Sequence, residues 1–118
     1  MRTIIKAQNI INGVDESIIK DKYIIIKDGL INEILNFNDF KPLNGDLIFN
    51  YDEEIVMPGM IDVHVHLAFS GITDNRSFRA ESADMDYGAQ ALRGYRFALE
   101  HMSYGFTSLR DMNAPGNV

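Results

Sequence analysis

The chain has 118 residues, of which 46% are hydrophobic and 24% are charged, and its 11 basic and 17 acidic side chains give a formal net charge of −6. This composition is typical of a globular domain and excludes collagen, coiled coils and long disordered tracts. The acidic balance argues against nucleic acid and anionic membranes as partners, and the absence of cysteine excludes disulfides, thiolate metal sites and a cysteine nucleophile.

The N-terminal residues read as a strand and not as a targeting segment. Met1 to Gly13 lacks the unbroken apolar core of a signal peptide, and no apolar run reaches the roughly 18 residues of a membrane helix. We therefore expect a cytoplasmic protein that does not bind membranes. The isoleucine-rich run Thr3–Ile11 predicts a strand that ends in a turn at Asn12-Gly13.

A hairpin is predicted next. The β-rich runs Lys22–Lys27 and Leu30–Leu35 flank Asp28-Gly29, and this arrangement is the strongest short-range signal for two paired strands. After a loop containing Asn44-Gly45, two further strands are predicted, Asp46–Tyr51 and Glu54–Met57.

The character of the chain changes at Pro58-Gly59, which is a candidate domain boundary because proline cannot donate to a sheet and glycine permits a bend. The following run, Met60–Leu67, alternates strictly and predicts a strand with two different faces. One face is aliphatic, and the other consists of potential metal ligands, namely Asp62, His64 and His66.

The remaining residues predict a βαβ unit. The polar segment Ala68–Ala83 has no periodicity and is expected to be a functional loop. A helix is predicted from about Met85 to Ser103, with Asp84 as its N-cap and Gly105 after its C-terminus. Its apolar stripe, expected to pack, is Tyr87, Ala91, Tyr95, Ala98, Leu99 and Met102.

A second strand, Phe106–Leu109, is predicted after this helix, and it ends at Arg110-Asp111 before a loop of residues 112–116. The two strands joined by the helix must be parallel. His101 lies in the last helical turn and is expected to be structural, because a partly protonated imidazole interacts favourably with a helix C-terminus.

The two strand histidines predict a metal site. Histidines two residues apart on a strand lie on one face with Cα atoms roughly 6.6 Å apart, so that both can bind one cation. Imidazole is the usual nitrogen ligand of zinc and also binds iron, nickel and copper. The pair ends the first strand of a βαβ unit, where parallel sheets and (β/α)8 barrels place their sites. A cupin is disfavoured because no glutamate follows His66 closely, whereas chance spacing and a structural histidine pair stay open as alternatives.

The segment Val56–His66, Val-Met-Pro-Gly-Met-Ile-Asp-Val-His-Val-His, resembles the signature that opens the barrel in the amidohydrolase superfamily of metal-dependent hydrolases. Gly105–Asp111 is similar to the second barrel strand of its imidazolonepropionase-like and prolidase-like branch. The hairpin, Ile-Ile-Lys-Asp-Gly-Leu-Ile, is similar to the small β-sandwich that flanks the barrel. The resemblance implies a mixed α/β fold: residues 1–58 form the N-terminal part of a β-sandwich, and residues 59–118 form the first βαβ unit of a (β/α)8 barrel.

This resemblance also implies roles for individual residues. His64 and His66 would bind the more buried ion of a centre with one or two divalent metals, zinc first among them. Asp62 matches the aspartate before the pair, and its carboxylate is expected to orient a ligating histidine, the alternative being a buried polar anchor. Arg110 and Asp111 match the end of the second barrel strand, where they either contact a substrate carboxylate or stabilise the strand end.

Residues 59–118 cannot complete a (β/α)8 barrel, which needs about 250 residues. By resemblance, the other metal ligands and the catalytic aspartate lie on later strands. We therefore expect a fragment of an enzyme that hydrolyses amide or other C–N bonds of small molecules with metal-activated water, and we expect the fragment to be inactive alone. Dipeptides, acyl amino acids and cyclic amides are the substrates that the resemblance suggests.

A non-catalytic, β-rich interaction module is the second hypothesis. Open sheet edges invite pairing with another chain, so we expect a homo-oligomer or pairing through these edges. An incomplete gene product is a third interpretation, which the residues alone do not test.

Overall fold

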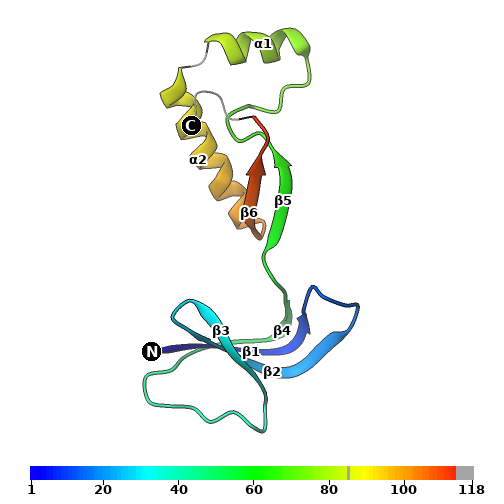
Figure 1. Cartoon of the computed structure of the whole chain (residues 1–118), viewed down its shortest axis with the longest axis vertical. Helices are drawn as coiled ribbons and strands as arrows, with labels where there is room; N and C mark the ends of the chain where they lie inside the picture. Colours follow the sequence, from blue (N-terminus) through cyan, green and yellow to red (C-terminus); the bar gives the residue numbers. More distant parts are fainter. Residues whose placement is uncertain (85, 114–118) are drawn as a thin grey trace. The chain divides into compact units, whose positions relative to one another are not determined.

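The computed structural model describes residues 1–84 and 86–113, and the chain divides into two compact units, Met1–Pro58 and Gly59–Val118. The N-terminal unit is built of strands, and the C-terminal unit combines strands and helices (Figure 1). The mixed α/β class expected from the sequence is therefore observed. Across the described residues, no helix has the length and apolar character needed to cross a bilayer.

The N-terminal unit is one mixed four-stranded sheet with the order β3-β2-β1-β4. β1 pairs antiparallel with β2 and parallel with β4, and β2 pairs antiparallel with β3. The four strands are β1 (Arg2–Ile11), β2 (Ile18–Lys27), β3 (Leu30–Asn36) and β4 (Leu47–Val56). The first strand is confirmed and ends at Ile11, but a six-residue loop with Gly13 at a φ of 74° follows it in place of a tight turn, and β2 begins four residues earlier than predicted.

The predicted hairpin is confirmed in detail. Lys27 pairs with Leu30, which leaves a two-residue connection between β2 and β3. Asp28 and Gly29 both have positive φ, 52° and 78°. This is the conformation that a type I′ turn requires, and it matches the right-handed twist of the flanking strands.

The two strands predicted at 46–51 and 54–57 form one continuous strand, β4. Its pairing with β1 shifts register between Ala7 and Asn9, so that Ala7 pairs with Tyr51 and Asn9 with Ile55. The acidic residues Asp52 and Glu53 lie in this irregular stretch. The sequence break seen at this point is thus a local bulge and not a turn.

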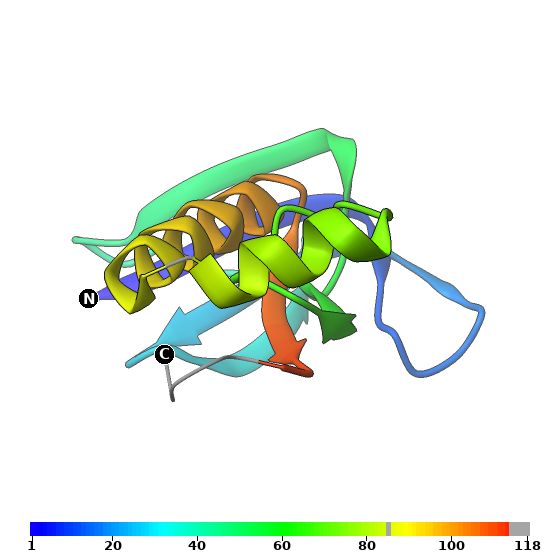
Figure 2. The same ribbon diagram turned by 90° about the horizontal axis from the view of Figure 1, so that it is seen from above.

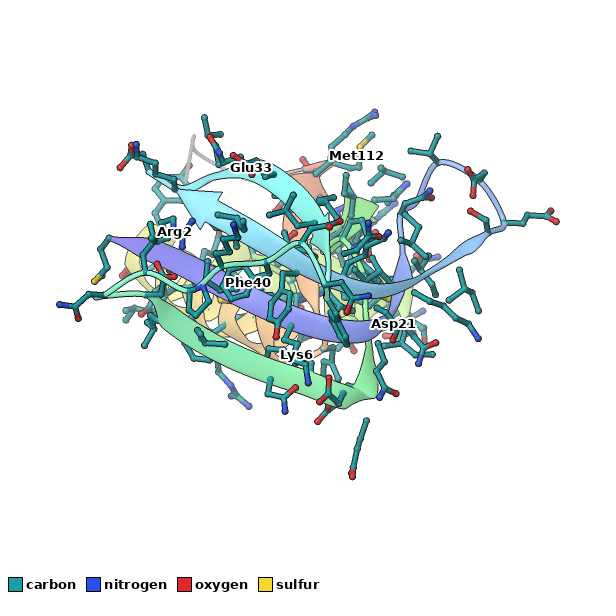
Figure 3. The ribbon with its side chains drawn as sticks, turned by 90° about the horizontal axis from the view of Figure 1, so that it is seen from below. Arg2, Lys6, Asp21, Glu33, Phe40 and Met112 are labelled. Atoms are coloured by element: carbon teal, nitrogen blue, oxygen red, sulfur yellow. The ribbon has the colours of Figure 1, made fainter. Side chains whose placement is uncertain are left out.

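One face of this sheet is covered by the segment that follows β3. Tyr23 stacks on Phe40 with ring centres 4.1 Å apart and contacts Phe37 at 5.0 Å. Arg2 lies over the Phe40 ring at 5.9 Å, and Lys6 lies over the Phe37 ring at 5.0 Å. Both cationic residues belong to β1, and Figure 3 labels them together with Phe40. The covering segment is therefore held by aromatic and cation–π contacts.

The other face is apolar and only partly covered. Its buried centre is a cluster of Ala7, Ile10 and Ile24. Around this centre lies a hollow of about 260 Å³, and eight of its twelve lining residues are isoleucine. We call the outer part of this surface the exposed isoleucine face, comprising Ile31 and Ile34 of β3, with 64% and 49% of their surfaces exposed.

Acid is expected to weaken the N-terminal unit through Asp46. Arg2 donates to both carboxylate oxygens, Nε to Oδ1 at 2.9 Å and Nη2 to Oδ2 at 2.6 Å, and the Leu43 N–H donates at 2.8 Å. These bonds lower the pKa of Asp46 from 3.8 to about 2. Since the folded-state pKa is depressed, the contribution is complete above the unfolded pKa and is lost as the pH falls through the folded one.

The measurement is urea unfolding of the wild type and Asp46→Asn at several pH values between 5 and 2. We expect the variant to be less stable at pH 5 and to lose less stability than the wild type between pH 4 and 2. Glu16→Gln, an exposed loop change in the same unit, is the control. Equal acid sensitivity of wild type and Asp46→Asn would contradict the assignment.

The C-terminal unit contains a parallel strand pair joined through helices, as predicted. The two arrows point the same way in Figure 1, and Figure 2 shows the helices and strands of this unit from above. Its elements are β5 (Met60–Val65), α1 (Asn75–Asp84), α2 (Tyr87–Ser103) and β6 (Phe106–Asp111). Gly105, with a φ of 89°, follows the end of α2, as the sequence predicted.

The predicted loop Ala68–Ala83 is wrong in its second half, where α1 lies. Asp74 precedes this helix, and its carboxylate accepts hydrogen bonds from the Ser77 N–H at 2.9 Å and the Ser77 hydroxyl at 2.8 Å. Helix α1 has few apolar residues, so its sequence shows no amphipathic period. A local side-chain cap and tertiary contacts therefore define a helix that the hydrophobic pattern did not reveal.

The start and the buried side of α2 also differ from expectation. The N-cap is Asp86, whose side chain accepts a hydrogen bond from the Gly88 N–H, and not Asp84, which ends α1. The predicted first helical residue, Met85, lies outside the described residues. Residues 114–116 of the predicted last loop also lie outside them. Tyr87 and Tyr95 of the predicted packing stripe are 63% and 67% exposed. Gln90 is instead the buried residue of α2. A strand pair offers too little surface to bury the whole stripe.

Gly59→Ala is expected to destabilise the C-terminal unit by about 1–3 kcal/mol, the usual cost of overpacking. A Cβ at position 59 would lie 2.1 Å from the Oγ1 and 2.7 Å from the Cβ of Thr107. Glycine is thus needed here for a close approach to β6. Gly94→Ala is the matched control, because its new Cβ meets nothing nearer than 3.7 Å and alanine favours a helix. In thermal unfolding we expect a lower melting temperature than the wild type for Gly59→Ala but not for Gly94→Ala. Equal melting temperatures of Gly59→Ala and the wild type would contradict the prediction.

Candidate metal centre

The two strand histidines lie together at the C-terminal end of β5. His64 is within the strand and His66 directly follows Val65, its last residue. Their ring centres are 5.3 Å apart, and the ring planes meet at 81°. Both residues are exposed.

This separation fits two imidazoles on one zinc ion. With Zn–N bonds of about 2.0–2.1 Å and a tetrahedral angle, the centres of two bound rings lie about 5 Å apart. The observed separation of 5.3 Å is close to this value. Across residues 1–84 and 86–113, however, no group of three or more histidine, aspartate or glutamate side chains is arranged to hold a metal. The pair fits part of a ligand set.

Asp62 supports the main chain at this site. Its Oδ1 accepts a hydrogen bond from the backbone N–H of His64 at 3.0 Å. The pairing of β5 with β6 shifts register between Asp62 and Val65, so the regular ladder is interrupted at this point. The carboxylate thus satisfies an N–H at an irregularity in the strand, which is a different contact from the expected one to an imidazole.

Asp111 and Arg110 lie at the end of β6, and Asp111 pairs with Val65. The Leu67 N–H donates to Asp111 Oδ2 at 3.0 Å, and the Asn113 N–H donates to Oδ1 at 3.0 Å. Arg110 is exposed at the same strand end. The structure thus brings Asp111 to the main chain beside His66, across 44 positions of sequence.

The segment after His66 forms a cavity that the sequence analysis did not identify. It has a volume of about 480 Å³, and His66, Phe69, Phe78 and His101 are among its lining residues. Phe69 is 6% exposed and contacts Phe78 with ring centres 5.0 Å apart. The two phenylalanines, nine positions apart around a polar stretch, were the available sequence signal.

A polar network fixes this segment against the helices. Glu81 of α1 pairs with Arg93 of α2 and accepts a hydrogen bond from the Ser70 hydroxyl at 2.8 Å. The side chain of Glu81 is 9% exposed and that of Arg93 is 29% exposed, so the ion pair is partly shielded from solvent. The network therefore joins the start of the segment to both helices.

His101 is bound within its own helix. Its Nδ1 lies 2.8 Å from the carbonyl oxygen of Phe97, and its ring meets Phe106 edge-on at 6.0 Å. Because the carbonyl can only accept, Nδ1 carries the proton of this bond. These contacts agree with the structural role expected from the sequence.

The sequence was compared with protein families and with known proteins. A sequence profile of the amidohydrolase family matches residues 55–117. The imidazolonepropionase of Picrophilus torridus is 39% identical over 61 residues, which cover 52% of this chain and 14% of that protein.

Two solved structures resemble the fold. An amidohydrolase matches with a TM-score of 0.79 and 21% identity over 99% of this chain and 27% of its own. A Xaa-Pro dipeptidase with bound methionine matches with a TM-score of 0.73 and 22% identity over 94% of this chain and 26% of its own. The chain thus spans about a quarter of these structures.

Proposed function

Because the chain belongs to the amidohydrolase family, we propose that it is the N-terminal part of a metal-dependent hydrolase and supplies His64 and His66 to the metal centre. The observation that carries this proposal is the placement of the two rings, whose centres lie 5.3 Å apart at the end of β5. In this proposal residues 1–58 are part of a β-sandwich, and residues 59–118 begin a (β/α)8 barrel whose sites lie at the C-terminal ends of its strands.

The reaction that we propose is hydrolysis of an amide or another C–N bond of a small molecule, such as a dipeptide, an acyl amino acid or a cyclic amide. A divalent cation, zinc first among them, would polarise the scissile carbonyl and acidify water when bound. The chain itself contributes two imidazole ligands, His64 and His66. Asp62 holds the main chain of the strand that carries them. Arg110, exposed at the end of β6, is the group that we propose for binding a substrate carboxylate.

We further propose that the chain alone does not catalyse the reaction. A catalytic zinc site takes three protein ligands and leaves one position for water or substrate. The described residues provide a pair of histidines and no larger group of ligands. Hydrolysis would therefore need further ligands and a base for water from outside residues 1–113.

Metal content and hydrolysis, measured on one preparation, test the proposal. We expect the chain to bind added zinc in a calorimetric titration, to lose it to a chelator, and to release no product from dipeptides, N-acyl amino acids or cyclic amides. A chain that binds no divalent metal in the titration would remove the basis of the proposal. Zinc-dependent turnover by the chain alone would contradict its inactivity.

A second candidate function is self-association through the N-terminal sheet. The specific observation in its favour is the exposed isoleucine face at the edge strand β3. An edge strand with unpaired backbone groups and apolar side chains is a template for pairing with a second copy of the chain. In this function the unit acts as an oligomerisation module.

A further inference from the structure

Three consecutive residues around His66 have their main chain held by hydrogen bonds. The carbonyl of Val65 accepts from the Met112 N–H at 3.0 Å, and the carbonyl of His66 accepts from the Phe69 N–H at 3.2 Å. The Leu67 N–H donates to Asp111 Oδ2 at 3.0 Å. The backbone from which the His66 ring projects is therefore fixed before, at and after the histidine.

Of these three bonds, the one to Asp111 is made by a side chain. It lies where regular pairing ends, since Val65 opposite Asp111 is the last matched position of β5 and β6. Without a partner at this point, the Leu67 N–H would have to find water or another acceptor. A carboxylate is a strong acceptor for an N–H, because bonds to an ionised group are shorter and stronger than neutral ones.

The second oxygen of Asp111 completes the arrangement. Oδ1 accepts the N–H of Asn113 at 3.0 Å, so one half-buried carboxylate bridges the residue after His66 and the segment after β6. Both oxygens are thus engaged with main-chain donors. An oxygen engaged in this way is poorly placed to bind a substrate.

We propose that Asp111 is a positioning residue, whose carboxylate holds Leu67 and thereby fixes the direction in which His66 presents its ring to a metal ion. This inference rests on the proposed function, since it assigns a supporting group to the same site. The loss of groups that orient a metal-binding histidine typically lowers metal affinity about 10–100-fold, because a mobile ligand must be ordered on binding.

The test compares Asp111→Ala and Asp111→Asn with a matched control, Asp74→Ala. The asparagine oxygen can still accept from Leu67, although its NH₂ group no longer accepts from Asn113. The carboxylate of Asp74 also accepts two hydrogen bonds in the C-terminal unit, but both come from Ser77 and neither involves residues 64–67. The control therefore measures what general loss of a carboxylate anchor does to the unit.

Three readouts separate positioning from stability: zinc affinity by calorimetry, hydrogen exchange of the Leu67 amide, and the metal-free NMR signals of the His66 ring. We expect Asp111→Ala to bind zinc about 10-fold more weakly, to exchange the Leu67 amide faster and to shift the His66 signals. We expect Asp111→Asn to stay near the wild type in all three. Asp74→Ala should keep wild-type zinc affinity whatever its melting temperature.

Wild-type zinc affinity in Asp111→Ala would overturn the proposal, as would equal losses in Asp111→Asn or Asp74→Ala. If the wild type itself binds no zinc, the proposed function fails, and the metal-free signals then decide the role of Asp111. Unchanged Leu67 exchange and His66 signals in Asp111→Ala would overturn the positioning role in that case also.

Discussion

Replacing His64 and His66 together with alanine is expected to abolish zinc binding by the chain, and each single replacement is expected to weaken it at least about 10-fold. The estimate is a lower bound, because losing even an outer partner of a metal-binding histidine costs about 10–100-fold in affinity. In the proposed site both rings, whose centres lie 5.3 Å apart, bind the same ion, so neither alone would offer an equivalent site. Calorimetric zinc titration of the three variants and the wild type measures the effect.

His101→Ala is the matched control, since it removes the same kind of side chain from the same unit. The Nδ1 of His101 is engaged with the carbonyl of Phe97, and we expect this variant to bind zinc as the wild type does. A double variant that still takes up zinc with wild-type affinity would show that the histidine pair is not the metal site. The proposed function would then lose the observation that carries it.

Features set by neighbouring residues could be predicted from the sequence. The hairpin follows from Asp28-Gly29, because both residues adopt the positive φ that a two-residue turn needs. The alternation of residues 60–67 predicted that His64 and His66 share one face of the strand, and in the structure their ring centres lie 5.3 Å apart. Local pattern was sufficient in these places because the pleat of a strand fixes which side chains meet.

Features set by distant partners could not be predicted. Helix α1 is anchored by Glu81, whose partners Ser70 and Arg93 are 11 and 12 positions away in the sequence. Because these contacts are polar and distant in sequence, they leave no hydrophobic period from which the helix could be predicted. Asp111 was recognised as the end of a strand, but its bond to Leu67 spans 44 positions. The need for glycine at position 59 arises from Thr107 in another strand. In each case a contact made only in the folded chain decides the role.

The apolar stripe of α2 and the exposed isoleucine face of the N-terminal sheet are exposed for the same reason. Each is amphipathic in sequence, and each lacks a covering element among the described residues. Large exposed apolar surfaces are rare on monomers and normally mark a contact with another element or another chain. The chain covers about a quarter of the solved structures that share its fold, so further elements of those structures have no counterpart among the described residues.

In the chain as it stands, we expect these surfaces to drive self-association, and we expect the double substitution Ile31→Lys with Ile34→Lys to reduce it. Both isoleucines are on edge strand β3, with 64% and 49% of their surfaces exposed, so lysine at these positions is compatible with the folded unit. Burying an unpaired ammonium in an interface costs several kcal/mol, which corresponds to at least about 100-fold in the dissociation constant. Light scattering coupled to size exclusion, over a range of concentrations, measures the change.

Asn44→Lys supplies the control, because it adds a positive charge in an exposed turn away from this face. We expect it to associate as the wild type does, and circular dichroism should show the same strand content in all three proteins. A wild-type chain that is monomeric at every concentration would contradict self-association altogether. Association that is equally strong in the double lysine variant would place the contact elsewhere, because two desolvated charges at the centre of an interface cannot be without effect.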